Sequence, residues 1–108
     1  MLILSTKLKN AIKYHANGMD LAFTLQNINI NGSKRGCSGF IRNNANGSVM
    51  YVSTEICRCD LHYMYRYANH EKDYTGYRNR WANTLDELAS AICTCLHKTP
   101  QEVNDRRI

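Results

Sequence analysis

Residues 57–68 read CRCDLHYMYRYA, and they carry the clearest two-residue alternation in the chain. One set of alternate positions is mainly apolar or aromatic: Cys57, Cys59, Leu61, Tyr63, Tyr65 and Tyr67. The other set is more polar: Arg58, Asp60, His62, Met64 and Arg66. Successive side chains of a β-strand point to opposite faces of a sheet, so the pattern predicts a half-buried strand. The first of these residues are equally compatible with a connection.

The residues before this stretch predict three more antiparallel strands, at 21–30, 35–43 and 48–56. The dipeptide Asn31-Gly32 and the Asn/Gly-rich residues 44–47 separate them, and both are typical of hairpin turns. In the first strand the apolar phase switches after Leu25, which predicts a β-bulge near Gln26 and Asn27.

After the alternating stretch, residues 77–82 predict a further strand. Tyr77 and Trp81 would share one face of it, and Arg78 and Arg80 the other. Because the connections between neighbouring strands are short, we expect an antiparallel meander of four to five strands.

Helices are predicted at both ends of the chain. Near the N-terminus, Ser5 or Thr6 can cap a helix that stops at Asn17-Gly18. Near the C-terminus, Thr84 and Glu87 form a capping box for a helix that starts at Leu85. A second capping box, Thr99-Pro100-Gln101-Glu102, predicts a short terminal helix to about residue 107.

These elements predict a single α+β domain over residues 1–108, with an N-terminal helix, an antiparallel sheet and two C-terminal helices. One core would unite the apolar stripes of the first two helices with the sheet. Its expected members are Leu8, Ile12, Phe23, Leu85, Leu88, Ile92 and Leu96.

Composition places the chain in an ordinary class. Its 108 residues are 44% apolar and 21% charged, close to the averages for a globular domain. The apolar run at the N-terminus ends after four residues, and nothing approaches the length of a membrane span. The five cysteines are an odd number, which does not suit a secreted disulfide framework. We therefore expect a cytoplasmic protein with reduced thiols and no contact with membranes.

The positive charge is concentrated in the first half of the chain. The formal net charge is +5, and residues 1–54 hold six bases against one acid, Asp20, whereas residues 55–108 hold eight of each. Such a one-sided field attracts polyanions and acidic partners, although a solvated face with no partner would look the same. The expected contact residues of this half are Lys9, Lys13, Lys34, Arg35 and Arg42.

A second basic set is expected on the sheet. Arg58, Arg66, Arg78 and Arg80 would share one face of neighbouring strands. Tyr63, Tyr65, Tyr67 and Trp81 would occupy the opposite face. Exposed aromatic rings stack on single-stranded bases, but a helix over that face would leave only phosphate contacts.

The cysteines allow a different function. Cys57, Cys59, Cys93 and His97 could hold zinc, since thiolates and imidazoles are its preferred ligands. The competing interpretation places Cys57, Cys59 and Cys95 in the core as small apolar side chains. No serine stands in a nucleophile elbow, and His15 falls on an apolar helical stripe, so we expect no enzyme and no cofactor.

The sequence thus predicts a small non-enzymatic binding protein. Its partner would be a nucleic acid, or the acidic surface of a protein complex that handles nucleic acids. The alternative is a small zinc- or thiol-dependent domain. A small basic chain with 12 asparagines and 7 tyrosines is also similar in composition to accessory proteins of phages and mobile elements. An inhibitor of a host defence machine would fit that composition.

Overall fold

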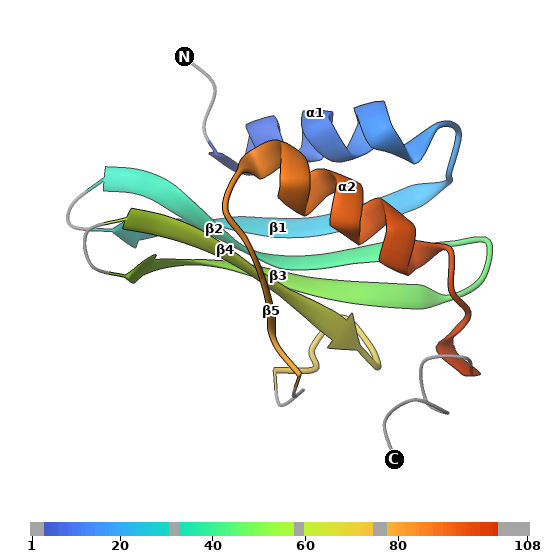
Figure 1. Ribbon diagram of the computed structural model, residues 1–108. Helices are drawn as coiled ribbons and strands as arrows, with labels where there is room; N and C mark the ends of the chain where they lie inside the picture. The colour runs from blue at the N-terminus through green and yellow to red at the C-terminus, as the bar shows by residue number, and fades with distance from the viewer. Residues whose placement is uncertain (1–3, 31–32, 58–59, 75–77, 102–108) are drawn as a thin grey trace.

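The computed structural model describes residues 4–30, 33–57, 60–74 and 78–101 (Figure 1). Residues 29–30, 33–35, 55–57 and 60–61 are described by the course of their backbone alone. In chain order the elements are α1 (Leu4–Ala16), β1 (Leu21–Ile30), β2 (Ser33–Asn43), β3 (Ser48–Cys57), β4 (Asp60–Ala68), β5 (Arg80–Ala82) and α2 (Leu85–Leu96).

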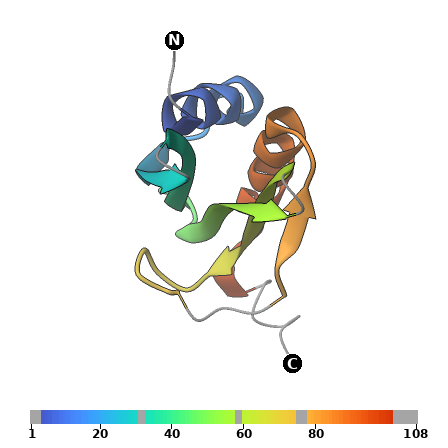
Figure 2. The ribbon, with the colours of Figure 1, turned by 90° about the vertical axis from the view of Figure 1, so that its left-hand side faces the viewer.

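The five strands form one antiparallel sheet in the order β1-β2-β3-β4-β5. Both helices lie on one face of this sheet (Figure 1, Figure 2). α1 packs over β1 and β2, α2 packs over β3, β4 and β5, and the helices also touch each other. The predicted α+β class, the N-terminal helix and the antiparallel meander are therefore confirmed.

The prediction for the C-terminus is confirmed for one helix. α2 begins at Leu85, directly after the capping box. The helix predicted from Thr99 falls mostly on residues 102–108, which lie outside the described residues, although Pro100 and Gln101 are helical. The described part of the chain therefore contains two helices, α1 and α2.

The alternating stretch at 57–68 is divided between two strands. β3 ends at Cys57, β4 begins at Asp60, and these two residues pair across the hairpin. The alternative left open for the first of these residues holds for Cys57, which ends β3, whereas Cys59 lies outside the described residues. The alternation itself is confirmed further along, where Tyr63, Tyr65 and Tyr67 all pack against the core under the helices.

The bulge predicted near Gln26 and Asn27 lies slightly further along β1. The register between β1 and β2 is regular through both residues and shifts only between Ile28 and Ile30. Gln26 is exposed on the face opposite α1, and Asn27 is exposed beyond Leu25, which lines the groove under α1. The apolar alternation therefore lapses there without any break in the ladder.

The faces predicted for the last strand are reversed. β5 pairs Trp81 with Met64 and Arg80 with Tyr65. Directly opposed residues share a face of an antiparallel sheet. Arg80 therefore points to the face that the helices cover, and Trp81 points to the opposite face.

The core lies between the two helices and the sheet. Leu8, Ile12, Leu88, Ile92 and Leu96 are at most 1% exposed, as predicted. The other two predicted members, Phe23 and Leu85, are half-buried at the rim of the same cluster.

Both ends of α2 are held by side chains. At its start, Thr84 Oγ1 accepts a hydrogen bond from the Glu87 N–H at 3.1 Å. At its end, the Leu96 carbonyl accepts hydrogen bonds from Asn43 Nδ2 and Asn46 Nδ2, both at 3.0 Å. These bonds satisfy backbone groups that a helix leaves without internal partners. The asparagines of the β2–β3 turn thereby tie the sheet to α2.

The connection after β4 covers part of the other face of the sheet, below the strands in Figure 1. Tyr74 stacks edge-on against Phe40 and Tyr51, with ring centres 5.3 and 5.8 Å apart. Phe40 is 1% exposed as a result. This face therefore carries a second, smaller apolar cluster.

Candidate binding surface

α1 presents three different flanks. Leu8 points into the core and is completely buried. His15 points toward α2, where its Nε2 lies 2.8 Å from Asp86 Oδ1. Lys9 lies on the other flank, over β1, with its Nζ 5.4 Å from the centre of the Phe23 ring. One flank of α1 is thus apolar and faces the core, a second is polar and faces α2, and a third is basic and lies above β1.

Lys9 and Lys13 form the basic flank of α1, a name used below for these two residues. They are one turn apart and, at 3.6 residues per turn, point about 40° apart around the helix axis. Lys7 points about 160° away from Lys9 by the same geometry. All three lysines are exposed. Lys7 is thus a cation of the same helix that does not belong to the basic flank.

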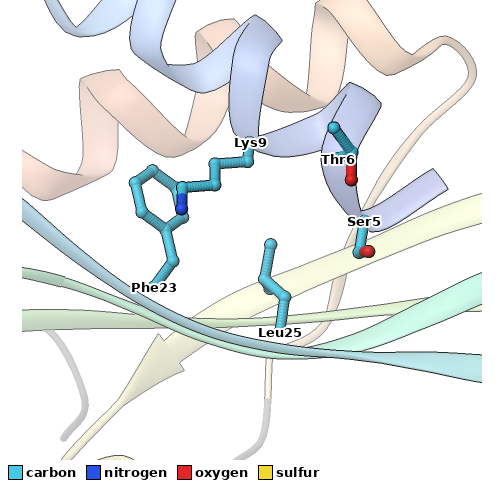
Figure 3. A pocket seen from close by; sticks show the side chains of 5 residues that line it. All are labelled: Ser5, Thr6, Lys9, Phe23 and Leu25. Atoms are coloured by element: carbon cyan, nitrogen blue, oxygen red, sulfur yellow. The ribbon is translucent and has the colours of Figure 1, made fainter. Parts of the chain in front are cut away.

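A groove of about 230 Å³ runs between the first turns of α1 and strand β1. Ser5, Thr6 and Lys9 line its helix side, and Phe23 and Leu25 line its sheet side. Figure 3 shows Phe23 and Leu25 pointing from β1 toward the helix, with the Lys9 side chain reaching over Phe23. The groove therefore combines an apolar floor, two hydroxyl groups and one ammonium group.

The charge of the basic flank is not neutralised. The sequence of α1, LSTKLKNAIKYHA, contains no acidic residue. Within the described residues, neither Lys9 nor Lys13 forms an ion pair. Asp20, the acid of the first 54 residues, is exposed just before β1. A positive field therefore extends from the basic flank into solvent.

Two of the predicted contact arginines are used inside the fold. Arg42 Nε donates to Glu71 Oε1 at 2.8 Å, and a second guanidinium nitrogen contacts the same oxygen. Arg66 is 2% exposed, lies 4.5 Å from the centre of the Tyr51 ring and donates to the Asp73 carbonyl at 2.7 Å. Both arginines tie the sheet to the connection after β4, and the Arg42 side chain stays 33% exposed whereas Arg66 is buried.

The predicted common face of sheet arginines does not form. Arg66 points to the face opposite the helices, whereas Arg80 points to the helix-covered face, with its guanidinium 5.2 Å from the Tyr67 ring. Arg78 is exposed and has a left-handed backbone, with φ 66°. Trp81 is 51% exposed on the side opposite Arg80.

Three further predicted contact residues cannot be placed. Arg58 lies outside the described residues. Lys34 and Arg35 belong to β2, but their side chains also lie outside the description. All three stay predictions from the sequence.

The tyrosine face is not open to nucleobases. Tyr63, Tyr65 and Tyr67 are half-buried and pack against the core. Burial raises the pKa of the Tyr63 and Tyr65 hydroxyls above the usual value for tyrosine. Because helices cover this face, the rings do not form a stacking platform.

Of the residues predicted to hold zinc, the structure describes the side chains of Cys93 and His97. Cys93 points into the core, where its Sγ lies 3.4 Å from the Ile12 carbonyl oxygen, and burial raises the pKa of its thiol. His97 is exposed at the end of α2. The side chain of Cys57 and all of Cys59 lie outside the description. In the described part of the chain no three His, Cys, Asp or Glu side chains are grouped as metal ligands.

The core interpretation of the cysteines needs one correction. Cys37 and Cys93 are the buried thiols of the described chain, and Cys95 is only half-buried. On α2 the fully buried stripe passes through Ala89 and Cys93, and Cys95 packs against the same core from its edge.

Sequence reasoning missed the groove itself. It assigned Phe23 to the core and Ser5 and Thr6 to a helix cap, whereas α1 already begins at Leu4. Two features of the sequence point to the groove: residues 21–30 contain no charge, and the predicted helix before them has lysines four residues apart. Only the packing of α1 over β1 reveals that these features meet.

The fold and this surface place the chain in the broad class of small α+β domains with a basic helix beside a sheet edge. No protein-family model, curated protein or solved structure matches the chain. Neither helix in the described residues has the length and apolar character to cross a membrane.

Proposed function

We propose that this protein is a non-enzymatic binding protein whose basic flank recognises an acidic surface of a protein partner. The observation that carries the proposal is the contrast between two groups of cations. Lys9 and Lys13 are exposed without an ion pair among the described residues, whereas Arg42 and Arg66 are engaged inside the fold. Free, adjacent cations are the groups that steer an acidic partner toward a surface.

The groove favours a protein over a nucleic acid as the partner. Its floor is apolar, with Phe23 and Leu25, and its rim is cationic. An acidic protein segment can supply carboxylates and apolar side chains together, whereas a phosphate backbone would use only the cations. The covered tyrosines support the same choice, because single-strand recognition depends on exposed rings.

The proposal keeps the setting that the composition suggests. The partner would belong to a complex that handles nucleic acids, and this protein would act as its inhibitor. A basic flank suits an acidic surface of such a complex, because opposite charges steer the two proteins together. Burial raises the pKa of the Cys37 and Cys93 thiols, so these two side chains are poor nucleophiles at neutral pH.

Charge reversal tests the proposal. The double variant Lys9→Glu/Lys13→Glu is compared with Lys7→Glu, which changes charge on the same helix outside the basic flank. The probes are acidic peptides and single- and double-stranded oligonucleotides of equal net charge. We expect the double variant to bind acidic peptides about tenfold more weakly than the native protein, and Lys7→Glu to lose about twofold or less.

Two results would contradict the proposal. One is tighter binding of the oligonucleotides than of the acidic peptides, which would make nucleic acid the partner. The other is an equal loss in Lys7→Glu and in the double variant, which would reduce the effect to net charge. Capture from nuclease-treated extracts of the source cells, with the same variants, then applies the comparison to the native partner.

A further inference from the structure

The two edges of the sheet are built differently. β5, at one edge, has three residues and lies beside Arg78 and Arg80. β1, at the other edge, has ten residues, LAFTLQNINI, with no charged residue and no proline. Proteins usually protect an edge strand with charges, proline or short length, because an unpaired edge offers a template for another strand. By these criteria β1 is the unprotected edge.

The hydrogen-bond phase of β1 shows which of its backbone groups face outward. The Asn44 N–H donates to the Asp20 carbonyl at 2.9 Å, so residue 20 faces β2. The Cys37 N–H donates to Thr54 on β3, so Cys37 and its partner Asn27 do not bond each other. Hydrogen-bonded and non-bonded pairs alternate in an antiparallel ladder. Residues 21, 23, 25 and 27 therefore direct their N–H and carbonyl groups to the free edge.

Two of the outward-facing residues, Phe23 and Leu25, also form the floor of the groove. Phe23 and Leu25 point their side chains up toward α1 (Figure 3) and their backbone groups to the edge. A strand added beside them would place every second side chain next to this floor and below the basic flank. Apolar side chains would contact Phe23 and Leu25, and acidic side chains would reach Lys9 and Lys13.

We propose that the free edge of β1 binds an extended segment of the partner as a sixth strand. That segment alternates apolar and acidic side chains on its helix-facing side. This inference rests on the proposed function, since it specifies how the acidic partner is held. Backbone hydrogen bonds to an edge strand supply affinity, and pockets for alternate side chains supply specificity, as in other cases of strand addition.

Charge decides against a second copy of the chain as the occupant. Two copies paired through β1 about a two-fold axis normal to the sheet would place both α1 helices on the same face, beside the shared edge. The basic flanks would then face each other, with Lys9 and Lys13 from each copy and no acidic residue in either helix. Like charges in close apposition oppose that arrangement, whereas an acidic segment relieves them.

The test uses a synthetic peptide in which valine and glutamate alternate on one face and serine and threonine on the other. Asn27→Pro removes one outward N–H, which β2 does not use, and proline is tolerated at strand edges. Asn27→Ala is the matched control, because it removes the same side chain and keeps the N–H. Thermal melts establish that both variants are folded.

We expect Asn27→Pro to bind the peptide about fivefold or more weakly than the native protein, and Asn27→Ala to stay within about twofold. Replacing the glutamates of the peptide by lysine should abolish binding. Equal binding by Asn27→Pro, together with a loss in Lys9→Glu/Lys13→Glu, would overturn strand addition and leave the proposed function standing.

Two other results would also overturn the inference. If the native protein fails to bind the valine–glutamate peptide, the proposed occupant is wrong. If the free protein forms a dimer in sedimentation experiments and Asn27→Pro dissolves it, the edge is occupied by a second copy instead.

Discussion

Gly39 of β2 lies directly against the backbone of β1. Its φ is +150°, and a Cβ atom there would lie 1.9 Å from the Thr24 carbonyl oxygen and 2.8 Å from Leu25 Cα. Both neighbours are backbone atoms of β1, so no side chain can rotate out of the way. Only glycine allows this close approach of the two strands.

We expect Gly39→Ala to lower the free energy of unfolding by about 3 kcal/mol or more, through overpacking and backbone strain. Ser38→Ala, at the preceding position, should cost about 1 kcal/mol or less. Urea unfolding measures both. A loss of similar size in the two variants would show that the nearby Thr24 carbonyl does not restrict position 39 to glycine.

Cys37 gives the fold a specific dependence on pH. It is completely buried, and burial raises the pKa of its thiol from 9.0 to about 11. Below about pH 9 the thiol is neutral in both the folded and the unfolded chain. Between about pH 9 and 11 the unfolded chain releases this proton while the folded chain keeps it, so stability falls as the pH rises.

This shift in the Cys37 pKa lowers the free energy of unfolding by about 2–3 kcal/mol once the pH exceeds the pKa of the folded protein's thiol. We expect the free energy of unfolding to decrease from about pH 8 to 11, and Cys37→Ala to remove much of that decrease. The raised pKa values of Tyr63, Tyr65 and Cys93 act in the same direction and contribute to the remaining decrease. An unchanged slope in Cys37→Ala would contradict the assignment.

At the scale of the elements, the end of α2 depends on the β2–β3 turn. Asn43 is 5% exposed, donates to the Leu96 carbonyl and accepts from the Ala45 N–H at 3.1 Å. Asn46 makes similar bonds from a more exposed position, donating to the same carbonyl and accepting from the Ser48 N–H. Two asparagines of one turn therefore hold both the turn and the helix.

We expect Asn43→Ala to lower the free energy of unfolding by about 2 kcal/mol and Asn46→Ala by about 1 kcal/mol. The difference follows from the burial of the two side chains, since water can replace the bonds of the more exposed Asn46 more readily than those of Asn43, which is 5% exposed. Unfolding in urea, followed by circular dichroism, measures both losses. A larger loss in Asn46→Ala than in Asn43→Ala would contradict this order.

The elements with strong local signals are the ones that the sequence predicts. α1 ends at Ala16, and Asn17 has a left-handed φ of 49°, as Asn17-Gly18 suggests. α2 starts where Thr84 and Glu87 form their capping box. The face of Trp81 could not be predicted, because the irregular connection between β4 and β5 sets the phase of β5 and carries no alternation of its own.

The candidate site divides in the same way. Lys9 and Lys13 share a flank because of helical periodicity, which is visible in the sequence. The pairing of Arg42 with Glu71 joins residues 29 positions apart and depends on how the connection after β4 folds back. The burial of Arg66 also depends on how that connection folds. The sequence alone therefore does not show that either arginine makes contacts within the fold.

Across the whole molecule, the charge asymmetry of the sequence becomes an asymmetry of the surface. α1, β1 and β2 come from the basic half of the chain and lie together at one side of the sheet. β4, β5 and α2 form the other side, where Asp86 and Glu87 lie in the first turn of α2. The acidic partner that we propose would therefore be drawn to the side that contains the edge of β1.

The β1–β2 hairpin should contribute to this attraction. We expect Lys34→Glu/Arg35→Glu to slow association with the acidic partner and to change dissociation less, because peripheral charges act mainly on encounter. Stopped-flow measurements at low and high salt separate the two rates, and the effect should shrink as salt screens the charges. Unchanged association by the folded double variant would remove the hairpin from the site.

The central claim is that the free edge of β1, below the basic flank, is the binding site. Amide hydrogen exchange of β1, residue by residue, with and without the valine–glutamate peptide, tests it most directly. The account predicts slower exchange at Leu21, Phe23, Leu25 and Asn27 in the complex, and little change at the alternate residues that already bond to β2. Protection that appears at β5 around Trp81 instead, or that shows no alternation along β1, would contradict it.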